Sequence, residues 1–399
     1  MRRLWDKGAP LDARVLEYTA GEDYALDERL VRHDVAASIA HAQMLCAQGL
    51  ISAADLEAIR AGLTALADEH ARGLWRIELA DEDGQTALER HLTARIGPAG
   101  ARIHLGRSRN DQVLTALRLY LRETADELAA GAEGCAAALE ALAAREAHTA
   151  LPGYTHMQQA MPSSVSLWAR GFAAELRDDA AGLRQVQRRL GKSPLGSAAG
   201  YGTPGLPIDR EATRAALGFA EVHQPVTAVQ LSRGKAEAQL LFEIALLMQD
   251  LSRFAADVLL FATAEFGFLT LPEPFTTGSS IMPQKRNPDV FELIRGRAAI
   301  AQAALAEALG VCAKLPSGYQ RDLQLIKAPL FRSIDLGQAT LAILPPAIAE
   351  LQFHPQSIRM DPAIRAAEEA NRLAVAEGIP FREAYRRIAA KLRGPEDSG

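Results

Sequence analysis

The chain has 399 residues, of which 48% are hydrophobic and 23% are charged, and its formal net charge is -5 at pH 7. This composition excludes an intrinsically disordered chain, because enough apolar side chains are present to build a core, and the length predicts roughly two or three domains. The net negative charge disfavours a general nucleic-acid binder, which needs an excess of Lys and Arg against phosphates.

The N-terminus gives no targeting signal, because no apolar segment follows its basic start, Met1-Arg2-Arg3. The most apolar stretch, 255–268, contains Asp257 and Glu265 and falls short of the about 20 apolar residues that span a bilayer. We therefore expect a cytoplasmic protein that binds neither membrane nor nucleic acid.

The chain is predicted to be helical nearly throughout. Ala and Leu dominate segments such as 133–148, whereas the β-branched runs typical of strands are scarce. From 229 to 261, apolar residues recur at helical spacing. Helices of this length predict an all-α protein with a long central bundle, which we expect to continue across a subunit interface.

Gly/Pro-rich segments interrupt the helices at 97–100, 151–153, 191–207, 271–287 and 314–318. After residue 355 the sequence changes to a shorter and more charged helical segment. We predict three domains: an N-terminal helical domain (1–100), a central long-helix bundle (101–350) and a short C-terminal helical domain (351–399).

Two features near residue 200 have ordinary structural explanations. The basic residues Arg184, Arg188, Arg189 and Lys192 are predicted to form a solvated helix face. Segment 200–205 matches the dinucleotide fingerprint GxGxxG, but a basic helical segment precedes it and prolines follow, whereas the fingerprint needs a strand before it and a helix after it. A surface loop is predicted there.

Segment 277–289 (TGSSIMPQKRNPD) is the strongest candidate for a functional loop. Asn287 is a good N-cap and Pro288 a favoured first helical residue, so a helix is predicted to begin there. Serines, a lysine and backbone N–H groups beside the positive end of a helix suit an anionic ligand.

The cysteines and histidines do not indicate a metal or a disulfide framework. Cys46, Cys135 and Cys312 are far apart and odd in number, and we expect core thiols. The histidines lack HxxxH and HExxH spacing, so neither a metal nor another cofactor is predicted.

Three segments together resemble a known family. Segment 278–288 (GSSIMPQKRNP) resembles the signature loop of the fumarase/aspartase superfamily. Segments 106–112 (GRSRNDQ) and 153–158 (GYTHMQ) resemble the corresponding motifs of the argininosuccinate lyases within it. The similarity continues through 319–327 to 378–382, in the order typical of the family.

The resemblance implies a carbon–nitrogen lyase that cleaves argininosuccinate to arginine and fumarate through a doubly negative aci-carboxylate. It assigns Ser279 as an alkoxide-like base, assisted by Lys285, whose positive charge favours the deprotonated serine. His156, held by Glu292, would handle the proton of the departing nitrogen. Which member of the Ser279 and His156 pair is acid and which is base stays open.

The resemblance also implies a set of substrate-binding residues, whose cations and amides suit the three carboxylates of the substrate. They are Arg109, Asn110, Thr155, Asn287, Tyr319, Gln324 and Lys327.

The sequence departs from the usual family pattern at several positions. Gln85 stands where a histidine is usual, and Leu105 where a threonine is usual. Ser232-Arg233-Gly234 replaces an Asp-Arg-Asp triplet, and Asp23 falls where a substrate-contacting serine is expected. The C-terminal domain is short, and the 198–201 loop is unusual.

The family forms homotetramers in which each active site takes its three motifs from three chains, and we expect the same arrangement here. Two alternatives stay open. One is a sister lyase acting on another adduct, such as adenylosuccinate or aspartate, and the other is a non-enzymatic structural homologue of the lens-crystallin kind.

Overall fold

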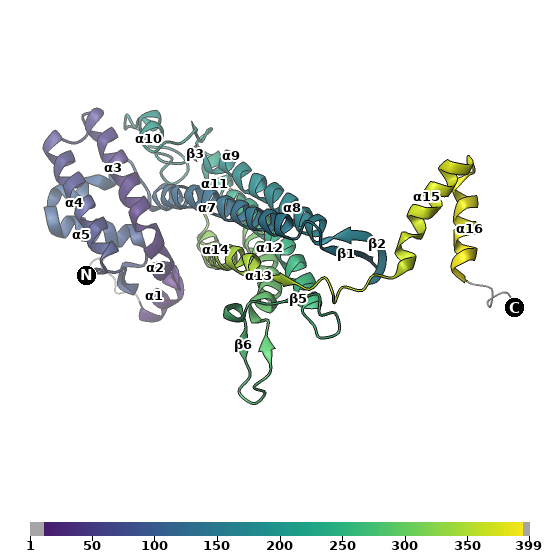
Figure 1. The fold of residues 1–399 in the computed structure, drawn as a ribbon. Coiled ribbons are helices and arrows are strands. Elements are labelled where there is room, and N and C mark those ends of the chain that lie inside the picture. The colour runs from purple at the N-terminus through teal and green to yellow at the C-terminus, as the bar shows by residue number, and fades with distance from the viewer. Residues whose placement is uncertain (1–11, 394–399) are drawn as a thin grey trace. The chain divides into compact units, whose positions relative to one another are not determined.

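A computed structural model describes residues 12–393 of the chain (Figure 1). The described part is mostly helical and contains only short strands, which confirms the all-α prediction. None of its helices combines the length and apolar character needed to cross a membrane. The N-terminal segment on which the targeting prediction rests, Met1-Arg2-Arg3, lies outside the described residues.

The helices and strands follow the chain in this order. The α-helices are α1 (Ala13–Ala20), α2 (Asp23–Leu26), α3 (Val31–Ala47), α4 (Ala53–Ala71), α5 (Gly84–Ile96), α6 (Pro98–Ala101), α7 (Arg109–Arg145), α8 (Val165–Gln185), α9 (Gln187–Leu190), α10 (Arg210–Ala216), α11 (Ala228–Leu231), α12 (Lys235–Phe261), α13 (Asp289–Cys312), α14 (Lys327–Ala349), α15 (Ala366–Glu377) and α16 (Phe381–Arg393). The strands are β1 (Ala150–Thr155), β2 (Gln158–Ser164), β3 (Lys192–Ser193), β4 (Glu221–Val222), β5 (Leu269–Thr270), β6 (Thr277–Gly278), β7 (Arg286–Asn287) and β8 (Gln352–Phe353).

The strands form four two-stranded sheets. β1 pairs with β2, β5 with β8 and β6 with β7, all antiparallel, while β3 and β4 are parallel. Two of these pairs, β1–β2 and β6–β7, are hairpins that carry the motif segments. The sequence analysis did not predict either hairpin.

The chain divides into two compact units. The first takes the residues up to Ala130 together with Ala180–Leu246 and Ala299–Gln338, and the second takes Gly131–Asp179, Leu247–Ala298 and the residues from Ala339 onward. The five long helices α7, α8, α12, α13 and α14 each contribute residues to both units. The division into three domains near residues 100 and 350 stays a prediction.

The helix predicted from 229 to 261 is interrupted once. α11 ends at Leu231 and α12 begins at Lys235, and Gly234 between them has a φ of +81°. This left-handed conformation does not continue an α-helix, and it favours glycine. A Cβ on Gly234 would lie 2.2 Å from the Cys312 sulfur, so the break also needs a residue without a side chain.

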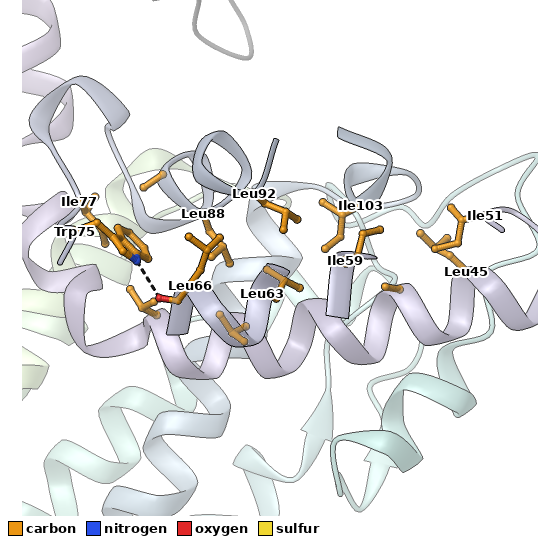
Figure 2. Close-up of a cluster of buried hydrophobic side chains, with 14 of the residues drawn as sticks. Leu45, Ile51, Ile59, Leu63, Leu66, Trp75, Ile77, Leu88, Leu92 and Ile103 are labelled. Carbon is orange, nitrogen blue, oxygen red and sulfur yellow. Dashed lines mark hydrogen bonds between the residues drawn. The ribbon is translucent and has the colours of Figure 1, made fainter. Parts of the chain in front are cut away.

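A hydrophobic cluster in the first unit joins α3, α4 and α5 (Figure 2). α4 starts at a capping box, in which Ser52 Oγ accepts from the Asp55 N–H at 3.1 Å, and Ile59, Leu63 and Leu66 on its apolar face are buried. The Trp75 indole N–H donates to the carbonyl of Leu66 at 2.9 Å, which ties the loop after α4 to this helix (Figure 2). The cluster thereby fixes α5, whose N-terminal end lies beside the candidate site.

We expect Leu63→Ala to lower the free energy of unfolding by about 2–5 kcal/mol, because Leu63 is fully buried in this cluster and its truncation leaves a cavity. Urea unfolding followed by circular dichroism, at matched protein concentrations, measures the change. Leu74→Ala is the control, because Leu74 is 66% exposed. Equal destabilisation by both substitutions would contradict the assignment of the cluster.

Candidate active site

A polar pocket in the first unit brings together five of the residues predicted to bind substrate: Arg109, Asn110, Tyr319, Gln324 and Lys327. Its further lining residues are Asp23, Glu82, Asp83, Gln85, Val113, Arg233 and Arg321. Four of the lining side chains are basic and three are acidic. Such a mixed lining suits a ligand that carries charges of both signs.

Lys327 is the buried cation of this pocket. Its Nζ lies 2.5 Å from Asp23 Oδ1 and 2.6 Å from Asp27 Oδ1. Burial opposes the charged form of Lys327, but the carboxylates of Asp27 and Asp23 outweigh it and raise its pKa. Burial raises the pKa of Asp23 to about 7, although the positive charge of Lys327 acts in the opposite direction. Lys327 therefore stays a cation while Asp23 titrates near neutral pH.

Arg109 is oriented by the start of α5. Its guanidinium donates to Asp83 Oδ2 at 2.7 Å, and Asp83 also caps α5 by accepting from the Thr86 N–H at 2.8 Å. Because Arg109 and Asn110 open α7, the N-terminal ends of two helices meet at this pocket. The motif segment 106–112 is thereby folded against it.

Behind the first turn of α7, Asp111 holds the loop that contains the GxGxxG match. Its carboxylate accepts from the backbone N–H groups of Ser108, Gly196 and Ala198, at 2.8 to 3.0 Å. Burial raises the pKa of Asp111 to about 6. Segment 200–205 itself forms turns, and the next helix, α10, begins only at Arg210, which agrees with the prediction of a loop.

Arg233 is a pocket residue to which the sequence analysis gave no role. It is 7% exposed, and its guanidinium lies 5.4 Å from the centre of the Tyr319 ring. Nε and one terminal nitrogen of Arg233 are buried without a hydrogen-bond partner in the described part of the chain. Donors of this kind suit a ligand carboxylate. The only sequence signal was the unusual triplet in which Arg233 lies.

The signature loop connects β6 and β7 and extends away from α13 as a hairpin (Figure 1). Ser279 Oγ accepts from the backbone N–H groups of Met282 at 3.1 Å and Ile281 at 3.4 Å. These donors favour a negatively charged oxygen over the hydroxyl. Lys285 is exposed on the same loop, and its ammonium makes no ion pair within residues 12–393.

The predicted start of the following helix was wrong by one residue. Asn287 belongs to β7 and pairs with Thr277, and its side-chain amide donates to the carbonyl of Gly278 at 3.2 Å. The carbonyl of Pro288 accepts from the N–H groups of Phe291 and Glu292, so α13 begins at Asp289. Asn287 therefore closes the hairpin and does not cap the helix.

Thr155 and His156 lie at the tip of the β1–β2 hairpin. His156 and Met157 form its two-residue turn with φ values of +52° and +61°, and Thr155 pairs with Gln158. Both turn residues are left-handed, as a tight hairpin turn of this kind requires. The turn contains neither Asn nor Gly, the residues typical of such turns, and the sequence analysis therefore did not predict it.

The predicted contact between His156 and Glu292 is not formed in the single chain. Both side chains are exposed, and no hydrogen bond or ion pair joins them among the residues that the structure describes. The predicted site residues therefore lie in three places: the pocket, the β6–β7 hairpin with the start of α13, and the β1–β2 turn.

Comparisons with known proteins place the chain in a family. A family model described as lyase matches residues 11–302. An argininosuccinate lyase of Sorangium cellulosum (strain So ce56) is 48% identical over 98% of this chain and 90% of that protein. Argininosuccinate lyases of Stenotrophomonas maltophilia (strain R551-3) and Xylella fastidiosa (strain 9a5c) are 44% and 42% identical, over 97% and 99% of this chain and 90% of each.

The chain belongs to the argininosuccinate lyase family. Solved structures agree with this fold. An EDDS lyase in complex with formate has a TM-score of 0.80 at 25% identity, covering 96% of this chain and 76% of that chain. A fumarate lyase:delta crystallin from Brucella melitensis bound to cobalt has a TM-score of 0.77 at 20% identity, over 98% and 94%, and shows the fold alone. Membership of the argininosuccinate lyase family confirms the predicted superfamily and lyase class.

The pKa of Asp23 predicts a pH-dependent stability. Its value of about 7 in the folded protein lies above the ordinary 3.8, so the folded state binds more protons between these limits. The contribution of Asp23 to stability is therefore complete below pH about 4 and is lost as the pH rises to about 7. Urea unfolding of the wild type and of Asp23→Asn across this range measures the difference between their free energies of unfolding. As the pH rises, the wild type should lose stability relative to the Asn variant.

Asp68→Asn, at an exposed position, is the matched control and should leave the pH profile unchanged. Parallel profiles for the wild type and Asp23→Asn would show that Asp23 titrates as an ordinary carboxyl.

Proposed function

We propose that the protein cleaves argininosuccinate by β-elimination, releases arginine and fumarate, and so completes arginine synthesis. The observation that carries this proposal is the pocket that gathers five predicted substrate residues in a chain 48% identical to a curated argininosuccinate lyase. The substrate combines three carboxylates with an amino and a guanidino group. The mixed lining of four cations and three carboxylates supports its recognition.

The three charged parts of the pocket suit different parts of the substrate. Arg233 has buried donors without partners, which suit a carboxylate. Arg109 keeps a fixed orientation through Asp83 and so provides a positioned cation. Asp23, next to Lys327, is an acceptor for a substrate cation. Because each charged group would bind a different part of the substrate, this division of roles supports binding in a single orientation.

In the proposed reaction, Ser279 removes a proton from the carbon that lies β to the departing nitrogen and carries a carboxylate. The amides of Ile281 and Met282 favour the alkoxide form of Ser279. The electron pair moves onto the neighbouring carboxylate, and Lys285 stabilises the resulting double negative charge. Collapse of this intermediate forms the carbon–carbon double bond of fumarate and breaks the carbon–nitrogen bond.

His156 completes the cycle in this proposal by protonating the departing guanidino nitrogen, with Glu292 holding the imidazole. The alternative, in which the two proton-handling residues exchange roles, stays open from the resemblance. The amide donors at Ser279 support the assignment of Ser279 as the base.

We also propose a homotetramer whose active sites are shared between chains. The exposed tips of both hairpins hold Thr155, His156 and Lys285, and a partner chain would bury them. Large apolar side chains are exposed along the long helices: Leu167, Phe242, Leu246, Leu293, Ile300 and Leu309. Such side chains favour a subunit interface. The cytoplasmic location stays a prediction of the sequence.

Ser279→Ala should lower kcat by about 10²–10⁴-fold, the range expected when a general base is removed. Fumarate release from argininosuccinate, followed by ultraviolet absorbance, measures the change. Ser280→Ala is the matched control, because Ser280 is the exposed neighbour in the same loop, and it should keep most of the activity.

Equal losses in Ser279→Ala and Ser280→Ala would contradict the role of Ser279. If the folded wild type instead cleaves adenylosuccinate or aspartate faster than argininosuccinate, the proposed substrate is wrong.

Shared active sites predict complementation between two inactive variants. Mixed tetramers of Ser279→Ala and His156→Ala should regain activity, because some sites then combine an intact Ser279 and an intact His156 from different chains. Native mass spectrometry verifies that subunits have exchanged. Mixed tetramers without activity would show that both residues act from one chain.

A further inference from the structure

A second cavity in the first unit, of about 300 Å³, has a cationic lining that the proposed reaction does not use. Its charged and polar lining residues are Arg118, Arg189, Lys192, His223, Ser232 and Lys235. Among residues 12–393, no acidic side chain lines the cavity. Arg189 and Lys192 belong to the basic run for which the sequence predicted only a solvated helix face.

Arg118 forms the buried base of this cavity. It is 3% exposed, and its guanidinium donates to the Lys192 carbonyl at 2.5 Å and to Ser232 Oγ at 2.8 Å. Its Nε is buried without a hydrogen-bond partner within the described chain. A buried cation with no carboxylate in direct contact is costly unless a further anion compensates it.

His223 adds a neutral donor. Its Nδ1 lies 3.1 Å from an Arg118 nitrogen, which has only protons to offer, so Nδ1 is the acceptor and the ring proton is on Nε2. Burial, together with the nearby charges of Arg118 and Lys192, lowers the pKa of His223 to about 4. His223 therefore remains a neutral hydrogen-bond donor at physiological pH.

The mouth of the cavity carries the other three cations. Arg189 uses Nε to bind Gln239 at 2.9 Å, and its terminal nitrogens have no partner within residues 12–393. Lys192 is paired with the exposed Glu221 at 2.9 Å. Lys235 opens the 27-residue helix α12, whose positive end adds to the field in the cavity.

Two nearby carboxylates offset this charge only in part. Glu221 pairs with Lys192 from outside the lining, and the buried Glu237 acts on Arg118 at longer range. The four lining cations outnumber these two acids by two, and Arg233 adds further positive charge near Arg118. A ligand with two negative charges would offset the excess of the lining.

We propose that this cavity is a binding site for a small dianion, either a phosphate group or a dicarboxylate. The site is separate from the substrate pocket, and its volume is at the lower end of small-molecule sites. The two cavities meet at the break between α11 and α12, where Ser232 and Lys235 line one and Arg233 lines the other. Occupancy would therefore stabilise the turn that carries Arg233.

The test uses the full-length protein and inorganic phosphate, with thermal unfolding measured at constant ionic strength so that screening does not change. Phosphate should raise the Tm of the wild type in a saturable way. The double variant Arg189→Gln/Lys235→Gln should weaken the apparent Kd by about tenfold or more, because it removes two charge-assisted contacts. Arg188→Gln, an exposed neighbour outside the cavity, is the control and should bind as the wild type does.

Two further variants separate this site from the others. Ser232→Asp should abolish the phosphate effect, because it puts a tethered carboxylate beside Arg118. Arg109→Gln, in the substrate pocket, should preserve it. Repeating the titration with succinate in the Arg109→Gln variant, whose substrate pocket has lost a cation, distinguishes the two ligand classes, since a stronger response to one anion identifies the chemistry of the ligand.

A phosphate effect that is lost in Arg109→Gln, or that is equal in Arg188→Gln and the double variant, would overturn the proposal. The absence of any saturable response of the wild type to both anions would overturn it as well. Circular dichroism verifies that each variant folds, so that a lost response can be attributed to lost anion binding.

Discussion

The buried charge cluster around Lys327 is the interaction on which the substrate pocket depends. Asp27 accepts from Lys327 Nζ at 2.6 Å and from the backbone N–H of Gly84 at 3.0 Å. The second of these contacts fixes the start of α5, where Asp83 in turn orients Arg109. One buried carboxylate thus connects α14 to the N-terminal helices and, through them, to α7. Removing Lys327 would leave Asp27 buried without its cation, which is strongly destabilising.

The groups proposed for proton transfer have a different physical setting. They lie on the two hairpins and at the start of α13, and in the single chain His156, Lys285 and Glu292 are exposed to water. Electrostatic stabilisation of an aci-carboxylate needs fixed donors in a site that excludes water. The pocket has oriented cations within one chain, Arg109 and Lys327, whereas the exposed groups are shielded from water only when another surface covers them. This contrast is the physical reason to expect an active site shared between subunits.

The left-handed turn at His156 and Met157 fits the same argument. A non-glycine residue with positive φ costs free energy, and two in succession need a surrounding structure that imposes them. Here the paired strands β1 and β2 impose the turn from both sides. The gain is that His156 projects from a rigid hairpin, so its imidazole is positioned with little loss of conformational entropy on assembly.

The sequence was sufficient where local physics decides the structure. The Ala- and Leu-rich segments are helices, and the glycine-rich segment 200–205 is a loop. It was insufficient where long-range contacts decide. Asn287 looks like a helix cap, but its amide is used across the β6–β7 hairpin. Arg233 acquires its place only because Gly234 turns the chain between two helices.

The turn at Gly234 also carries lining residues of both cavities. Ser232 accepts a hydrogen bond from Arg118 without neutralising it. Gly234 leaves no room for a side chain against Cys312, so the turn has little freedom to move independently of α13. An anion bound beside Arg118 would order Ser232 and Lys235 and therefore the backbone on both sides of Arg233. Arg233 offers donors without partners to the substrate pocket. The proposed anion, bound in the cationic cavity on one side of the turn, would therefore influence substrate binding on the other side.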